Sequence, residues 1–187
     1  MPFPPHTLDG VLPPFSGQPW ESAGRSPYPT SMHELVDRYA ISRNRCEILA
    51  GFIAYREAMR KIGFPPDAFQ WLDGSFVDIR SIEPKDIDVV TFYSPPAPHD
   101  AASFVREIQA QAPELLPGLG KTAFRVDGYP IELTHPAPTL VGLASYWFGL
   151  FSHQRLTFAW RGFLQIELGV EDQLAAQLLL QRSQAFP

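Results

Sequence analysis

The sequence predicts an α/β protein, because short β-prone apolar runs alternate with longer segments of helical periodicity. Two β-prone runs lie at 69–72 and 87–92, and between 43 and 62 apolar residues recur at three- and four-residue spacing. Apolar residues make up 45% of the 187 positions, which is enough for one domain with a sizeable core. We therefore expect a mixed sheet with flanking helices over 31–187, preceded by an extended Pro-rich arm at 1–30.

The N-terminal arm contains eight of the twenty prolines and few periodic apolar positions. Such a segment is neither a helix nor a central strand, because proline lacks a backbone donor. Val11, Leu12, Phe15 and Trp20 could pin the arm to the body of the protein. The alternative is a flexible tail, and composition alone leaves both open.

Two helices are expected after the arm. Ser31 with Glu34 three residues later forms a capping-box pattern, which predicts a short helix through Tyr39. Ser42 is the expected cap of a longer helix over 43–62, which Gly63 ends.

The rest of the chain predicts alternating strands and helices. Asp127-Gly128 lies between two β-prone runs, a strong signal for a hairpin with a two-residue turn, and Pro130 indicates an edge strand. The expected elements are strands at 69–72 and 87–92, a helix at 100–112, hairpin strands at 122–126 and 129–134, a helix at 139–150, a strand at 162–168 and a helix at 171–183.

Charge and cysteine content restrict the class of protein. The net charge of −5 argues against tight nonspecific binding of nucleic acid, which requires a basic surface. The arginines and lysine between 43 and 61 are interpreted as a solvated helix face. Cys46 is the only cysteine, and we expect it to be a small core residue. Without a signal sequence or an apolar run of membrane-spanning length, we expect a cytoplasmic protein that does not contact a membrane.

The most informative pattern is Gly74-Ser75, a spacer of ten residues, and then Asp86 and Asp88 at the start of an apolar strand. Strand side chains alternate between faces, so the two carboxylates should share one face. Adjacent carboxylates suit Mg²⁺ or Mn²⁺, and a Gly-Ser turn beside them can offer backbone N–H groups and a hydroxyl to phosphate oxygens.

Gly74, Ser75, Asp86 and Asp88 resemble the signature of the DNA polymerase β type nucleotidyltransferase superfamily, with the spacer of its minimal members. A closer likeness to small, poorly characterised bacterial nucleotidyltransferase-like proteins lies in 10–14, 71–76 with 86–89, 146–148 and 161–164. The resemblance implies a nucleotidyltransferase-like fold and metal-dependent transfer of a nucleotide from a nucleoside triphosphate. Asp86 and Asp88 would hold the metal, and Gly74 and Ser75 would bind the nucleotide.

Members of the superfamily usually have a third acidic residue on a neighbouring strand, and two positions compete for it. Glu132 is flanked by Ile131 and Leu133, so its side chain should point away from theirs. Asp127 is already explained by turn chemistry. We therefore expect Glu132 to be the third catalytic and metal-binding carboxylate, with Asp127 as the alternative.

The resemblance thus predicts a Mg²⁺- or Mn²⁺-dependent enzyme that transfers a nucleoside monophosphate, with AMP expected, to a hydroxyl of a protein or an RNA. By analogy with relatives, it implies a place in a toxin–antitoxin or phage-defence pair. The alternative hypothesis is a catalytically weakened binding module that neutralises or scaffolds a partner protein. A homo-oligomer is compatible with either hypothesis.

Overall fold

The computed structural model describes residues 3–21, 23–155, 157–169 and 172–186. Its centre is one five-stranded mixed sheet in the order β1-β5-β2-β3-β4, which confirms the predicted α/β class. Strands β3 and β4 are parallel, as are β1 and β5, whereas β2 is antiparallel to both of its neighbours. The strands are β1 (Tyr28–Pro29), β2 (Phe69–Asp73), β3 (Ile87–Tyr93), β4 (Val126–Glu132) and β5 (Leu164–Glu167).

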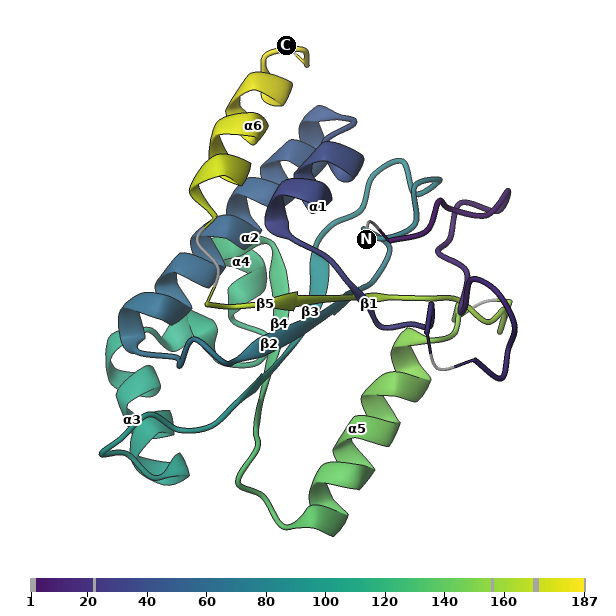
Figure 1. Ribbon diagram of the computed structural model, residues 1–187. Coiled ribbons are helices and arrows are strands. Elements are labelled where there is room, and N and C mark those ends of the chain that lie inside the picture. The colour runs from purple at the N-terminus through teal and green to yellow at the C-terminus, as the bar shows by residue number, and fades with distance from the viewer. Residues whose placement is uncertain (1–2, 22, 156, 170–171, 187) are drawn as a thin grey trace.

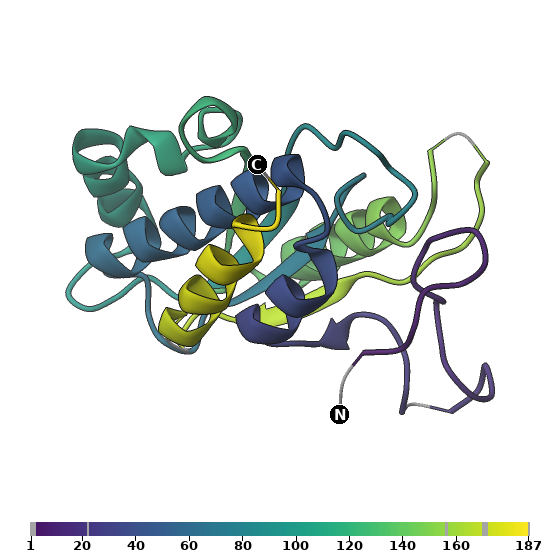
Figure 2. The ribbon, with the colours of Figure 1, turned by 90° about the horizontal axis from the view of Figure 1, so that it is seen from above.

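Helices cover both faces of the sheet (Figures 1 and 2). Helices α1, α2 and α6 lie on one face, and α5 lies alone on the other. The helices are α1 (Met32–Tyr39), α2 (Arg43–Ile62), α3 (Ala101–Gln111), α4 (Gly120–Phe124), α5 (Ala137–Phe151) and α6 (Gln173–Ser183), with a 3-10 turn at Pro113–Leu115. The expected start of the last helix at Glu171 falls outside the described residues. No helix in the described parts of the chain is both long and apolar enough to cross a membrane.

The predicted caps set the ends of the first two helices. The Ser31 hydroxyl accepts a hydrogen bond from the Glu34 amide at 3.2 Å, and Ser42 accepts one from the Arg45 amide at 3.3 Å. Gly63 ends α2 at a φ of 97°, a left-handed conformation that glycine adopts without strain. These bonds satisfy helix donors that would otherwise lack partners.

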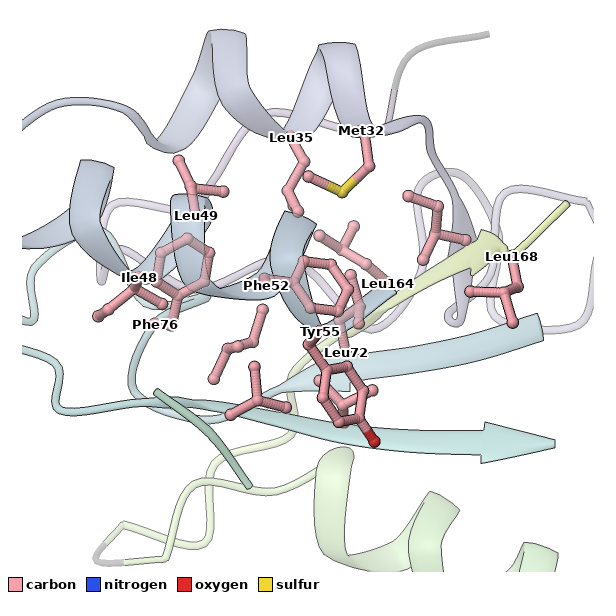
Figure 3. Close-up of a cluster of buried hydrophobic side chains, with 14 of the residues drawn as sticks. Met32, Leu35, Ile48, Leu49, Phe52, Tyr55, Leu72, Phe76, Leu164 and Leu168 are labelled. Atoms are coloured by element: carbon pink, nitrogen blue, oxygen red, sulfur yellow. The ribbon is translucent and has the colours of Figure 1, made fainter. Parts of the chain in front are cut away.

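Each face of the sheet has its own apolar cluster. On one face, α2 directs Leu49, Phe52 and Tyr55 against the strands (Figure 3). On the other face, α5 packs Trp147 and Phe151 against alternate strand residues. That second cluster contains Val90, Phe92, Ile131, Trp147, Phe151 and Phe163. Strand side chains repeat every two residues. Asp88, two residues before Val90 on β3, and Asp127, two residues before Tyr129 on β4, therefore also face α5.

The predicted hairpin around Asp127 and Gly128 is wrong. Strand β4 runs unbroken through both residues, and α4 occupies the place of the expected first hairpin strand. Gly128 is needed for close packing, since a Cβ there would lie 2.4 Å from the Tyr55 hydroxyl oxygen of α2. The strand is the sheet edge beyond β3, as Pro130 indicated.

The Pro-rich arm packs on the body of the protein through its described residues. Leu12 is fully buried, and the Ile79 amide donates to the Gly10 carbonyl at 3.0 Å. Phe3 is also buried, whereas Trp20, an expected anchor, is 79% exposed. The described part of the arm is therefore not a free tail, and it buttresses the loop that follows β2.

Candidate active site

Three aspartates form a row across neighbouring strands. In the sheet register, Asp73 of β2 pairs with Asp88 of β3, and Asp88 pairs with Asp127 of β4. Each aspartate lies two residues from a strand residue that packs under α5, namely Trp71, Val90 or Tyr129. All three aspartate side chains therefore point to the face that α5 covers. The row therefore concentrates negative charge at one end of the sheet.

The row opens into a cavity of about 830 Å³ that contains the Gly-Ser motif and both motif aspartates. Asp86 and Asp88 line the same space, as the period of two predicted, together with Gly74 and Ser75. The two aspartates therefore face the same space, and the Gly-Ser turn lies beside them, as the sequence predicted. Ser75 is exposed, so its hydroxyl is available to a ligand.

Gly74 permits the close approach of its loop to the carboxylates. Its φ of 93° is unfavourable for other residues, and a Cβ at this position would lie 2.3 Å from Asp88 Oδ2. The Val77 amide donates to the Gly74 carbonyl at 3.3 Å and closes the turn. Glycine is therefore required here for conformation and for space.

Glu132 does not lie with the motif carboxylates, which corrects the preferred choice of third acidic residue. It pairs with Tyr93 at the opposite end of β3, five positions after Asp127 in β4. That spacing corresponds to about 16 Å along a strand. The residue beside Asp88 is Asp127, the alternative, because the parallel register of β3 and β4 brings the start of both strands together.

The carboxylates perturb one another and hold a lysine. Burial, followed by the nearby Asp86 and Asp127 charges, raises the pKa of Asp88 to about 6. Lys121 Nζ lies 2.7 Å from Asp127 Oδ2 and 3.2 Å from Asp86 Oδ2. The hydrogen bond to Asp127 is the largest cause that raises the pKa of Lys121, so the ammonium stays charged. Lys121, which is not part of the Gly-Ser and aspartate motif, thus belongs to the site.

A buried ion pair supports the loop that carries the Gly-Ser motif. Arg161 Nη2 donates to Asp73 Oδ2, and both side chains are almost completely buried. Burial raises the pKa of Asp73, and the Arg161 charge opposes this rise. Arg161 Nη1 also lies 3.5 Å from the Gly74 carbonyl oxygen. Arg161 thus joins the segment before β5 to the end of β2, and with Arg155 it adds positive charge to the cavity wall.

The donor set fits a hard divalent cation. Asp86, Asp88 and Asp127 offer carboxylate oxygens, which Mg²⁺ and Mn²⁺ prefer, and Asp127 Oδ1 is buried without a hydrogen-bond partner. Within the described residues, however, no three acidic, histidine or cysteine side chains are already arranged to hold a metal ion. The Lys121 ammonium lies between the Asp86 and Asp127 carboxylates. A metal ion bound by all three carboxylates would therefore displace the ammonium or share these two carboxylates with it.

Sequence reasoning missed Asp73, Lys121 and Arg161 as parts of this site. Asp73 stands one residue before Gly74, and the period of two along β2 could have placed it beside Asp88. Lys121 and Arg161 had no local signal, because the contact of Lys121 with Asp86 spans 35 residues and that of Arg161 with Asp73 spans 88, so both depend on the tertiary fold.

Comparison with known proteins gives a family without an assigned activity. No curated protein and no solved structure gave a significant match to this chain. One family does match, over residues 4–167, and it is described as a family of unknown function. The match includes the arm, the aspartate row, Lys121 and Arg161. The chain therefore belongs to the DUF6932 family.

Proposed function

We propose that this protein is a metal-dependent nucleotidyltransferase that moves a nucleoside monophosphate, with AMP expected, from a nucleoside triphosphate to a hydroxyl of a protein or an RNA. The observation that carries the proposal is the alignment of Asp88 and Asp127 on parallel strands, with Asp86 and the Gly74-Ser75 turn in the same cavity. Phosphoryl-group chemistry needs positioned charge more than covalent catalysis, and this cavity concentrates charge at one place.

Each polar group in the cavity has a role in the proposal. Asp86, Asp88 and Asp127 would hold Mg²⁺ or Mn²⁺, which supplies positive charge at the reacting phosphate when it is bound. Ser75 would donate its hydroxyl hydrogen to a phosphate oxygen, and the turn at Gly74 would bring backbone N–H groups close. Asp127 would also help to deprotonate the attacking hydroxyl.

The arginines in the cavity wall would complete the binding of the triphosphate. Arg155 is exposed and lines the cavity, so its guanidinium is available to phosphate oxygens. Arg161 is engaged with Asp73 and would act by holding the Gly-Ser turn in place. A nucleoside triphosphate donor also implies a cytoplasmic location, which forms part of this proposal.

A second candidate is a module that binds a partner protein without catalysis. Helix α5 has no charged residue along its fifteen positions, yet Val141 is 65% exposed, Tyr146 61% and Phe148 38%. An uncharged apolar face of this kind is uncommon on a monomer and is typical of a contact surface. In this candidate the aspartate cavity would bind no nucleotide.

A transfer assay separates the two candidates. The protein is incubated with each of the four nucleoside triphosphates, labelled at the α-phosphate, together with Mg²⁺ or Mn²⁺ and cell protein or RNA as acceptor. We expect label to enter an acceptor, and the double variant Asp86→Asn, Asp88→Asn to lose at least about a thousandfold in rate, since such groups stabilise charge in the transition state. The exposed Asp67→Asn serves as the matched control. Equal transfer by the double variant would refute the enzyme proposal.

A further inference from the structure

Lys121 occupies a place that a metal ion would otherwise take. Its ammonium contacts Asp127 Oδ2 at 2.7 Å and Asp86 Oδ2 at 3.2 Å, so it bridges a carboxylate of β4 and one from the residue just before β3. A Mg²⁺ ion held by the same two oxygens would need the space that the ammonium fills. The ammonium and such an ion cannot both occupy this position.

The backbone around Lys121 is held firmly. Lys121 follows Gly120 in α4, where a Cβ on the glycine would lie 2.8 Å from the Val126 carbonyl oxygen. At the other end of α4, a Cβ on Gly51 of α2 would lie 2.0 Å from the Phe124 carbonyl oxygen. Close contacts at both ends fix α4 against β4 and α2. The lysine is therefore presented to the carboxylates by packed backbone, although its side chain is 47% exposed.

Two groups of the carboxylate cluster lie outside the contacts of the ammonium. Neither Asp88 nor Asp127 Oδ1 contacts Lys121, and Asp127 Oδ1 is buried without a partner. An unpartnered carboxylate oxygen in a buried position is costly, which points to a ligand that completes it. Asp88 and Asp127 Oδ1 are thus the groups left to hold a cation beside the ammonium.

Charge balance favours one ion beside the lysine. The cavity lining has five carboxylates, at Asp73, Asp78, Asp86, Asp88 and Asp127, and three cations, at Lys121, Arg155 and Arg161, which gives a formal net charge of −2. Without nucleotide, one divalent ion balances the charge of this lining, whereas two would leave it with a net charge of +2. An excess at this place would be unfavourable in a partly buried cavity.

We propose that the Lys121 ammonium permanently replaces one of two divalent ions, so that the site binds one Mg²⁺ or Mn²⁺ for each nucleotide. This inference rests on the proposed function, because it concerns the same cavity. It assigns Lys121 as the residue that sets the metal stoichiometry of the site.

Equilibrium dialysis with Mn²⁺ and α,β-methylene ATP, a nucleotide that resists transfer of its α-phosphate, tests the stoichiometry. The amounts of Mn²⁺ and nucleotide retained by the protein are both measured. We expect a ratio of one in the wild type and two in Lys121→Met. Lys61→Met, an exposed lysine of α2 that also pairs with a carboxylate, is the matched control and should keep a ratio of one.

The outcomes separate this inference from the proposed function. Two results would overturn the role of Lys121: a Mn²⁺-to-nucleotide ratio of two in the wild type, or a ratio of one in a Lys121→Met variant whose fold is intact by circular dichroism. Either result would still show that the cavity binds a nucleotide with metal. If neither protein retains metal or nucleotide, both the inference and the proposed function fail. Lys121→Arg, which keeps the positive charge, should retain a ratio of one and shows that charge, not side-chain volume, sets the count.

Discussion

Asp88 and Asp127 lie opposite each other on the parallel strands β3 and β4, and Asp73 lies opposite Asp88 on its other side. Like charges on neighbouring strands destabilise a sheet, so this row is a local cost to folding. An ion pair with Arg161 reduces the repulsion at Asp73, and an ion pair with Lys121 reduces it at Asp127. Asp88, in the centre, has no ion pair among the described residues.

Replacement of Asp88 by asparagine should stabilise the protein at neutral pH. The pKa of Asp88 is raised from 3.8 to about 6, so between these values the folded protein binds more protons than the unfolded chain. Its free energy of unfolding therefore falls as pH rises through this window, and the loss is complete above pH 6. Asp88→Asn lacks this loss and should be more stable than the wild type by about 1–3 kcal/mol at pH 7.5.

Urea unfolding of both proteins at pH 3.5 and pH 7.5, without divalent metal, measures this effect. The advantage of Asp88→Asn over the wild type should be larger at pH 7.5 than at pH 3.5. A difference in stability that is the same at both pH values would show that Asp88 carries no unfavourable charge in the folded protein.

Gly74→Ala should be more destabilising than Gly63→Ala. Both glycines have positive φ, 93° and 97°, but a Cβ at Gly63 meets nothing within 4 Å, whereas a Cβ at Gly74 lies 2.3 Å from Asp88 Oδ2. Backbone strain alone costs about 1–2 kcal/mol at either position. The clash should add at least about 1 kcal/mol at Gly74, as measured by denaturant unfolding. Equal losses would mean that the loop moves away from Asp88 without cost.

Arg161→Met should destabilise the fold strongly, because it leaves the Asp73 carboxylate buried without a partner. Loss of one member of a buried ion pair typically costs about 3–5 kcal/mol. Arg182→Met, which breaks an exposed pair with Asp37 in which the side chains are 47% and 53% exposed, should cost less than about 1 kcal/mol.

A double-mutant cycle with Asp73→Asn identifies the cause of that loss. Arg161→Met combined with Asp73→Asn should be more stable than Arg161→Met alone, since the unpaired charge has been removed. If the effects of the two substitutions on the free energy of unfolding simply add, Arg161 does not stabilise the Asp73 carboxylate.

The local patterns of the sequence predicted most elements, because caps and periodicity act within a few residues. Ser31, Ser42 and Gly63 delimit α1 and α2 as expected. The interpretation of Asp127-Gly128 as a turn failed because Gly128 serves contact with Tyr55 of α2, a distant residue. That error also favoured Glu132 over Asp127, because the turn was taken as the reason for the aspartate at position 127.

Buried charges were the other feature that local patterns did not reveal. Arg45 and Arg56 were interpreted as part of a solvated helix face, yet they are 1% and 0% exposed. Arg56 donates to Asp172 at 2.7 Å, and Arg45 donates to the Phe76 carbonyl at 2.6 Å. Such partners lie on distant segments, so only the tertiary structure shows that these arginines are satisfied inside the fold.

The most direct test of the central claim compares Asp127→Asn with Glu132→Gln, two substitutions on β4, in the binding of ATP with Mg²⁺. A ligand at a hundred times its dissociation constant adds about 2.7 kcal/mol, which raises the melting temperature by a few degrees. We predict that the wild type and Glu132→Gln show this metal-dependent rise and that Asp127→Asn loses it. A rise that survives in Asp127→Asn and is lost in Glu132→Gln, or that is absent from the wild type with all four nucleoside triphosphates, would contradict the account.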